Sequence, residues 1–96
     1  YRLILSTIFN AIGCRVEVEK MISTGRIDMV AETSTIIYVL ELKLSNNGGV
    51  NAAAEQIKAK RYAEPFKADK RKIIALAIEL EDLGKGLIDW KEVSFA

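Results

Sequence analysis

The chain has 96 residues, of which 50% are hydrophobic and 28% are charged, and its net charge is +1. These values predict one small globular domain, and they exclude a protein-wide basic field, so any nucleic-acid contact must use a local patch. Histidine is absent, which excludes histidine catalysis and argues against a zinc site. Cys14 is the only cysteine, so no intramolecular disulfide can form, and a reducing, cytoplasmic setting is expected.

The first two predicted elements are a helix and a strand. From Tyr1 to Ile12, apolar residues recur at helical spacing, and Gly13 suits the end of a helix. From Arg15 to Ile22, apolar residues alternate with glutamates, which predicts a strand with one polar face. The chain opens on Tyr1 without methionine. We therefore expect a single domain, residues 1–96, that is part of a longer protein.

Two apolar strands joined by a short polar turn follow, from Arg26 to Glu32 and from Ile36 to Leu44. Three charges lie within these strands: Asp28, Glu41 and Lys43. The second strand is almost entirely apolar, as in a strand that is covered on both faces. Because side chains alternate along a strand, Glu41 and Lys43 must project from the same face.

The turn between these strands decides how Asp28 meets Glu41. If Thr33 and Ser34 form a two-residue turn, Asp28 lies opposite Val39 and diagonal to Glu41, roughly 7–8 Å away. A turn shifted by one pair places Asp28 directly opposite Glu41. Only a turn of odd length would put the two carboxylates on different faces, because a slip of one residue flips every side chain.

The second half of the chain predicts another helix and two more strands. Ser45 to Gly49 is rich in turn-forming residues, and Asn51 to Ala63 is rich in alanine and reads as a helix. Arg71 to Glu79 predicts an apolar strand, and the more polar Leu87 to Phe95 predicts an edge strand. The order of elements predicts an α/β fold with a central mixed sheet flanked by helices.

Charges inside an apolar strand are costly unless they pair or hold a metal ion. Taken singly, Asp28, Glu41 and Lys43 are each best explained as part of a buried salt-bridge cluster. Taken together on neighbouring strands, two acids and a lysine fit a site for a divalent cation, because carboxylates suit Mg²⁺ or Mn²⁺.

This pattern resembles the core of PD-(D/E)xK nucleases, which is a restriction-endonuclease-like αβββαβ arrangement. It is most similar to small bacterial and archaeal domains that follow an AAA-type ATPase domain in one chain. Three segments carry the resemblance: Gly25-Arg26-Ile27-Asp28, then Tyr38-Val39-Leu40-Glu41-Leu42-Lys43, then the stretch from Ala53 to Tyr62 that includes Gln56. Together they span most of the chain. Two features depart from the family pattern: the first helix contains no acid, and no proline precedes Asp28.

The resemblance implies a role for each residue of the site. Asp28, Glu41 and the backbone carbonyl of Leu42 would hold Mg²⁺ or Mn²⁺. Lys43 would help position and deprotonate the attacking water, and Gln56 would face the site from the second helix. In similar domains a glutamate precedes the first of these segments. Glu19 is therefore a candidate for a further carboxylate ligand.

A nucleic-acid contact would fall to four basic residues, Arg26, Lys58, Lys60 and Arg61. Arg26 has two interpretations, a phosphate contact or an ion pair with Glu19 or Asp28. The three residues on the second helix have two as well, phosphate contacts or an ordinary solvated surface.

The resemblance implies a metal-dependent nuclease domain that hydrolyses phosphodiester bonds in nucleic acid, with DNA as the expected substrate. The alternative is a nuclease-fold module that no longer cleaves and that binds nucleic acid or regulates an attached ATPase domain. In either case the expected partners are nucleic acid and an ATPase domain of the same parent chain.

Overall fold

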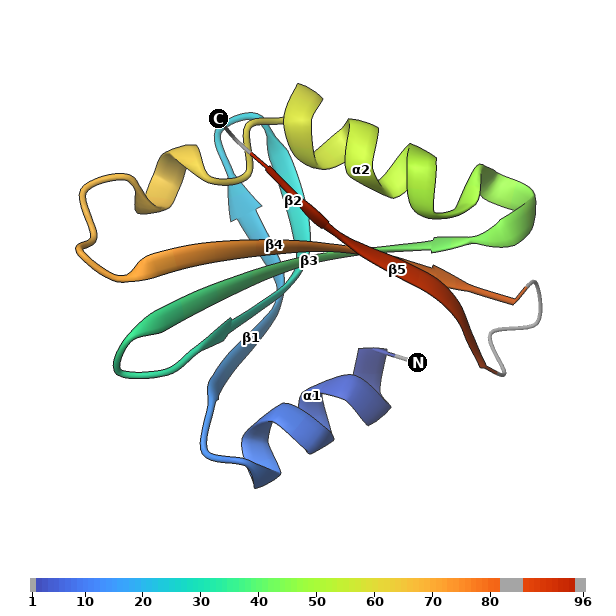
Figure 1. The fold of residues 1–96 in the computed structure, drawn as a ribbon. Coiled ribbons are helices and arrows are strands. Elements are labelled where there is room, and N and C mark those ends of the chain that lie inside the picture. The colour runs from blue at the N-terminus through green and yellow to red at the C-terminus, as the bar shows by residue number, and fades with distance from the viewer. Residues whose placement is uncertain (1, 82–85, 95–96) are drawn as a thin grey trace.

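The computed structural model describes residues 2–81 and 86–94, which form one five-stranded sheet with a helix on each face (Figure 1). The strands follow chain order across the sheet: β1 (Arg15–Ile22), β2 (Gly25–Glu32), β3 (Ile36–Leu44), β4 (Lys72–Leu80) and β5 (Leu87–Val93). Neighbouring strands are antiparallel except for β3 and β4, which are parallel and are joined through a helix. The predicted α/β fold with a central mixed sheet is therefore confirmed.

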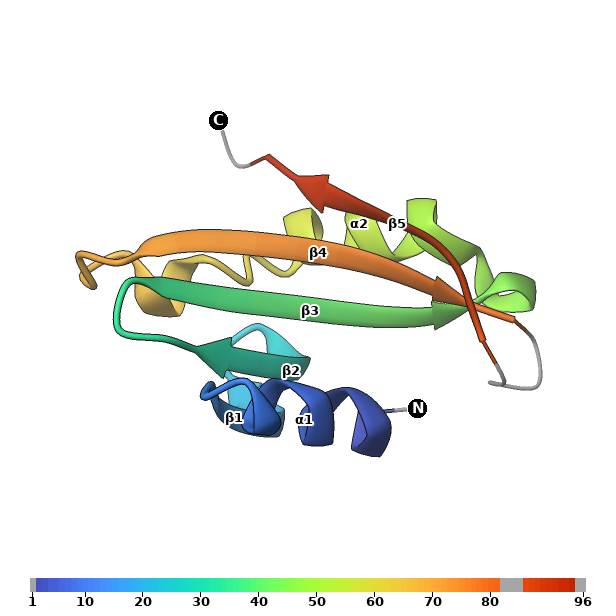
Figure 2. The same ribbon diagram turned by 60° about the horizontal axis from the view of Figure 1, so that its bottom comes forward.

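The two helices cover opposite faces of the sheet, as Figures 1 and 2 show. Helix α1 (Arg2–Ala11) packs against β1 and β2, whereas α2 (Gly49–Ala59) packs against β3, β4 and β5. The predicted first helix began at Tyr1, which lies outside the described residues. Within residues 2–81 and 86–94, no helix is long and apolar enough to cross a bilayer.

Side-chain alternation along β3 divides the core into two halves. Ile37 and Val39 lie in the cluster under α2, whereas Leu40 and Leu42 belong to the cluster on the α1 face. On that α1 face, the ring centroids of Phe9 and Tyr38 are 6.0 Å apart. The alternation continues beyond this core and places Glu41 and Lys43 on the α2 face, as the sequence pattern predicted.

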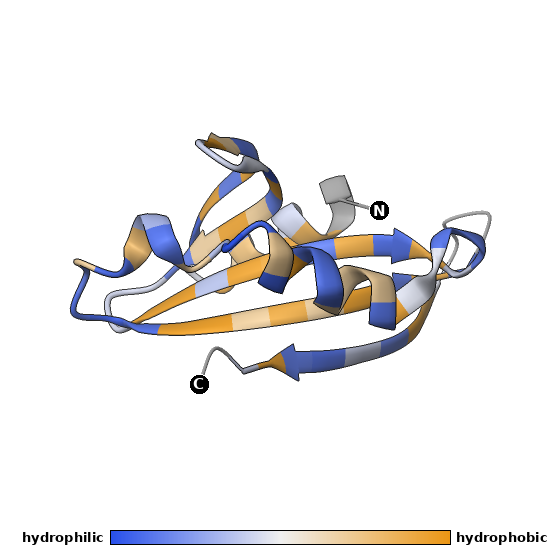
Figure 3. Ribbon diagram, turned by 90° about the horizontal axis from the view of Figure 1, so that it is seen from above, coloured by the Kyte–Doolittle hydropathy of each residue, from blue (hydrophilic) through white to orange (hydrophobic). Residues whose placement is uncertain are grey.

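Strand β5 is the edge strand that its polarity predicted. Figure 3 shows that β3 and β4 are hydrophobic along most of their length, whereas β5 is mainly hydrophilic. It pairs on one side only, with β4, and Trp90 lies opposite Ile78. The strand ends at Val93, and Phe95, which the prediction included, lies outside the described residues.

Helix α2 begins earlier and ends earlier than the predicted range of Asn51 to Ala63. It begins at Gly49, because Gly48 and Gly49 adopt φ values of 100° and 62°. It ends at Ala59, because Arg61 turns left-handed with a φ of 52°. The N–H groups of Arg61 and Tyr62 then donate to the carbonyls of Lys58 and Ile57, which is a Schellman ending.

The β2–β3 turn lies one residue further along the chain than the two-residue turn at Thr33 and Ser34 that the sequence suggested. Thr33 pairs with Ile36 instead, so the two central residues are Ser34 and Thr35. The side-chain oxygen of Thr33 accepts the N–H groups of Thr35 and Ile36, and these hydrogen bonds fix the turn. The shifted register, with Glu32 opposite Ile37, is therefore the one that forms.

Candidate functional site

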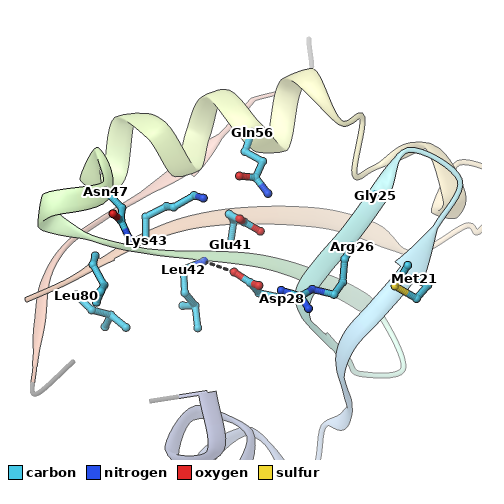
Figure 4. Close-up of a pocket in the computed structure, with 11 residues that line it drawn as sticks. Met21, Gly25, Arg26, Asp28, Glu41, Leu42, Lys43, Asn47, Gln56 and Leu80 are labelled. Carbon is cyan, nitrogen blue, oxygen red and sulfur yellow. Dashed lines mark hydrogen bonds between the residues drawn. The ribbon is translucent and has the colours of Figure 1, made fainter. Parts of the chain in front are cut away.

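The shifted register brings the two carboxylates together. Met29 pairs with Leu40, and continuing the register by one residue sets Asp28 opposite Glu41. The regular ladder between β2 and β3 stops there, and the Asp28 carboxylate accepts the N–H of Leu42 at 2.9 Å instead. Figure 4 shows Asp28 and Glu41 facing the same space. Both line one pocket of about 790 Å³.

The neighbouring strand is distorted at the same level. Glu19 on β1 has a left-handed backbone, with a φ of 53°, and it falls where the β1–β2 register would place it opposite Asp28. The pairs on either side of this position, Val18 with Met29 and Lys20 with Ile27, are regular. A non-glycine residue in this conformation is costly, and such residues cluster at functional sites.

Glu41 is the one charged residue in the buried core of the described part of the chain, with 2% of its surface exposed. Its Oε1 atom has no hydrogen-bond partner among those residues. Burial and the charge of Asp28 together raise the pKa of Glu41 from 4.5 to about 8, although the nearby charge of Lys43 lowers it. The charges of Asp28 and Lys43 therefore both act on Glu41, whose Oε1 atom has no hydrogen-bond partner among the described residues.

Lys43 lies two residues beyond Glu41 on the same face of β3. Figure 4 shows its side chain running beneath α2, toward the space between Glu41 and Gln56. No carboxylate of residues 2–81 and 86–94 lies within ion-pair distance of its ammonium group. Its charge is therefore available to a ligand in the pocket.

Helix α2 and the turn after it supply the roof of the site. The Gln56 amide donates to the Tyr62 hydroxyl at 2.9 Å, and that hydroxyl donates to the carbonyl of Arg26 at 2.7 Å. Tyr62 is fully buried, and burial raises the pKa of its hydroxyl, so the hydroxyl keeps its proton. Because a hydroxyl has one hydrogen, it cannot also donate to Glu41 while it is bonded to Arg26.

This network gives a prediction for Tyr62→Phe. The variant loses both hydrogen bonds of the hydroxyl and leaves the carbonyl of Arg26 without that donor. We expect a loss of about 1–3 kcal/mol in the free energy of unfolding, measured by urea denaturation. Tyr38→Phe is the matched control, since no hydrogen bond of the half-buried Tyr38 hydroxyl is found among the described residues. Equal effects in the two variants would contradict the role given to Tyr62.

The other predicted site residues lie outside the pocket or at its rim. Arg26 lines the pocket, but its guanidinium also lies 3.7 Å from the Glu19 carboxylate. Although the β1–β2 register would set it opposite Asp28, the Glu19 side chain is exposed and does not line the pocket. Lys58, Lys60 and Arg61 are exposed at the far end of α2, where the carbonyl of Lys60 accepts the Thr24 hydroxyl.

Comparison with known proteins agrees with this arrangement. Residues 1–90 match the family described as the PD-(D/E)XK nuclease superfamily. The chain belongs to this superfamily. It is also 32% identical, over 79 residues, to an "Uncharacterized protein in vnfD 5'region" of Azotobacter chroococcum mcd 1. That match covers 82% of this chain but only 15% of the relative, so the chain spans a small part of that protein's length.

Members of the PD-(D/E)XK superfamily typically use divalent metal ions, and the residues present fit such an ion. Asp28 and the unsatisfied Oε1 of Glu41 are oxygen donors in one pocket. The carbonyl of Leu42 should point to the same edge of β3 as its N–H, which donates to Asp28. No cluster of three or more acidic or cysteine residues occurs among the described residues. Mg²⁺ needs only one or two carboxylates, with water and phosphate completing its shell.

Sequence reasoning missed Glu79, a residue that positions helix α2 over the site. Its carboxylate accepts the Val50 N–H at 2.9 Å, in the first turn of α2, and the Ser45 hydroxyl at 2.6 Å. These hydrogen bonds lower the pKa of Glu79. An acid at a helix N-terminus is stabilising, but the sequence places Glu79 at the end of a strand far from α2. Only the parallel pairing of Lys43 with Glu79 brings the two regions together.

Proposed function

We propose that this domain is a Mg²⁺-dependent nuclease that hydrolyses phosphodiester bonds, with DNA as its substrate. The observation that carries the proposal is the buried Oε1 of Glu41, which has no partner among the described residues and lies in one pocket with Asp28 and Lys43. A buried carboxylate oxygen without a donor is costly, and a bound cation would satisfy it. Superfamily membership makes this chemistry the expected one.

Each residue has a distinct role in this proposal. Asp28, Glu41 and the carbonyl of Leu42 would hold the metal ion, which supplies water activation and offsets charge on the phosphate. Lys43 would hold the phosphate oxygen as a point charge and orient the attacking water. Gln56, which is held by its hydrogen bond to Tyr62, would position the same water or phosphate from the side of α2.

Phosphates beyond the scissile one would be held by a local basic patch that consists of Arg26, Lys58, Lys60 and Arg61. Arg71 is not part of this patch, because its guanidinium forms ion pairs with Asp69 and Glu32 at 2.7 and 2.8 Å. Within residues 2–81 and 86–94, no carboxylate lies within ion-pair distance of the three α2-end cations. A patch of this size is consistent with a net charge of +1.

The patch predicts how DNA binding depends on salt. Replacing Lys58, Lys60 and Arg61 together by alanine should weaken binding and flatten the slope of log affinity against log salt by up to about 2–3. Fluorescence anisotropy of a labelled oligonucleotide between low and moderate salt measures this slope. The triple alanine variant of Lys67, Lys70 and Lys72 removes equal charge elsewhere. An unchanged slope in the first variant, or equal slopes in both, would show that Lys58, Lys60 and Arg61 do not contact DNA phosphates.

The proposed activity is tested on supercoiled, linear and branched DNA with Mg²⁺, Mn²⁺ or EDTA, with the intact parent protein as the enzyme. We expect cleavage of at least one of these DNA forms with either metal and none with EDTA. Calorimetric titration of Mg²⁺ and Mn²⁺ into Glu41→Ala should show weaker binding than in the parent, because a ligand is lost. Glu55→Ala, an exposed helix carboxylate, is the control. Equal metal affinity in Glu41→Ala and the parent would remove the main support for a nuclease.

The presence of only two clustered carboxylates among the described residues favours a second candidate function. A site with few ligands, one of them with a raised pKa, binds metal weakly at neutral pH. In that case the domain would be a non-cleaving module that binds nucleic acid or regulates an attached ATPase domain. Metal binding without cleavage of any DNA form would favour this alternative.

The wider context of the domain is also a proposal. We expect it to work in the cytoplasm as one part of a longer protein with an AAA-type ATPase domain. The relative from Azotobacter chroococcum supports the proposal of a longer protein, because the similar segment makes up only 15% of its length. Sequencing the parent gene and testing ATP hydrolysis by the whole protein would show whether an ATPase domain is present.

A further inference from the structure

The pocket that holds the carboxylates continues around the edge of β3. Glu41 and Lys43 project toward α2, whereas Leu42 and Leu44 project toward the α1 face, and all four line this one pocket. It can reach both faces because the β2–β3 ladder ends at Met29 and Leu40, so β3 continues to Leu44 without a partner on that edge. The catalytic residues therefore occupy only part of the cavity.

The part on the α1 face is apolar. Leu42 and Leu44 are half-buried, and Leu80, which pairs with Leu44 in the parallel register, is almost fully buried. Figure 4 shows Leu42 and Leu80 extending from the sheet away from Gln56. These three leucines, the leucine shelf, are continuous with the carboxylates and offer no hydrogen-bonding side chain.

The opposite end of the pocket carries one apolar side chain beside a charged one. Met21, on β1, lines the pocket beside Arg26 and is 73% exposed. Its hairpin is anchored to the end of α2 by the hydrogen bond from Thr24 to Lys60. An exposed methionine is ordinary on a surface when it stands alone, but here it stands at the mouth of the cavity that holds the proposed metal ligands.

The charge around the cavity is small compared with what a duplex would need. Lys43 and Arg26 are the two cations among the lining residues, and the Arg26 guanidinium also lies within ion-pair distance of the Glu19 carboxylate. Proteins that hold duplex DNA by its backbone contact many phosphates with many cations. Apolar side chains contact nucleic acid through base faces, and those faces become accessible when a base leaves the stack.

We propose that this pocket takes unpaired nucleotides, with the scissile phosphate at Asp28, Glu41 and Lys43. The base on one side of that phosphate rests on the leucine shelf, and the base on the other side contacts Met21. The substrate class is single-stranded nucleic acid or an unpaired end, rather than an intact duplex. This inference rests on the proposed nuclease function for the position of the phosphate, but base binding can be measured without cleavage.

The test uses three labelled probes in EDTA, so that only binding is measured by anisotropy. They are a twelve-nucleotide oligothymidine, an abasic backbone of equal length, and a blunt hairpin duplex. The parent should bind oligothymidine about tenfold more tightly than either other probe. Met21→Ala should lower the oligothymidine affinity about fivefold and leave the abasic affinity unchanged, because it removes apolar contact and no charge. Ile12→Ala, at a residue that is 70% exposed but outside the pocket, should change neither.

The outcomes separate this inference from the nuclease proposal. Equal affinity for oligothymidine and the abasic probe, or equal effects of Met21→Ala and Ile12→Ala, would overturn it, even if Mg²⁺ supports cleavage. A base-dependent loss in Met21→Ala, without cleavage of any probe when Mg²⁺ is added, would uphold it and refute the nuclease. Tighter binding of the hairpin duplex than of oligothymidine would also overturn it.

Discussion

Lys43→Ala should abolish phosphodiester cleavage while leaving metal binding nearly unchanged. The lysine is not a metal ligand, but its ammonium group projects into the pocket and no carboxylate among the described residues pairs with it. Removing one charge that contacts the reacting phosphate costs about a hundredfold to a thousandfold in rate. The measurements are the initial rate of DNA cleavage with Mg²⁺ and the calorimetric affinity for Mg²⁺ of the same variant.

Two controls make the Lys43 result specific. Lys70→Ala removes an equal charge from an exposed position outside the pocket, and it should leave the rate within about twofold, as expected for a surface position without described contacts. Lys43→Arg keeps the charge but changes the donor geometry, and it should recover only part of the rate. If Lys43→Ala lost metal affinity in parallel with its rate, the lysine would act by holding the site together rather than on the phosphate.

The second large effect concerns the stability of the metal-free protein against pH. Burial and Asp28 raise the pKa of Glu41 from 4.5 to about 8 in the folded protein. Between these values the folded state binds more protons than the unfolded state, so the stability falls as the pH rises. A shift of this size corresponds to up to about 5 kcal/mol, which is a large part of the stability of a small domain. Urea denaturation in EDTA at pH 5, 7 and 9 measures it.

Glu41→Gln gives the matching variant for this prediction. The amide keeps the shape of the side chain but does not ionise, so the variant should be more stable than the parent at pH 9 and should lose most of the pH dependence. Glu55→Gln makes the same chemical change at an exposed position and should keep the dependence of the parent. Mg²⁺ should restore stability to the parent at high pH but not to Glu41→Gln, because the ion binds the ionised carboxylate. A parent stability that does not change from pH 5 to pH 9 would contradict the proposed state of Glu41.

Local patterns were sufficient to predict much of this arrangement. Alternation along β3 predicted that Glu41 and Lys43 share a face, and the order of elements predicted the sheet with its two covering helices. The register was less certain, because Thr33, Ser34 and Thr35 all suit a turn. The choice among them depends on the hydrogen bonds of one threonine side chain, which no periodicity reveals.

Long-range contacts were the part that the sequence could not supply. Glu79 caps α2 from 29 residues away, and this contact depends on the parallel pairing of β3 with β4. Glu19 was a candidate ligand by its place in the sequence, but its left-handed backbone and its pairing with Arg26 leave it outside the pocket. The role of Tyr62 likewise depends on the helix ending that turns it back over the sheet.

The unpaired edge of β3 between Leu42 and Leu44 also bears on solubility. A free strand edge with apolar side chains is a template for pairing with another chain, and proteins protect such edges with charges. Here Asp28 occupies the N–H of Leu42, and Lys43 places a charge between the two leucines. We therefore expect Asp28→Ala to associate at high concentration more readily than Glu55→Ala. Light scattering would detect this association. Equal scattering by the two variants would show that Asp28 does not protect this strand edge from pairing with another chain.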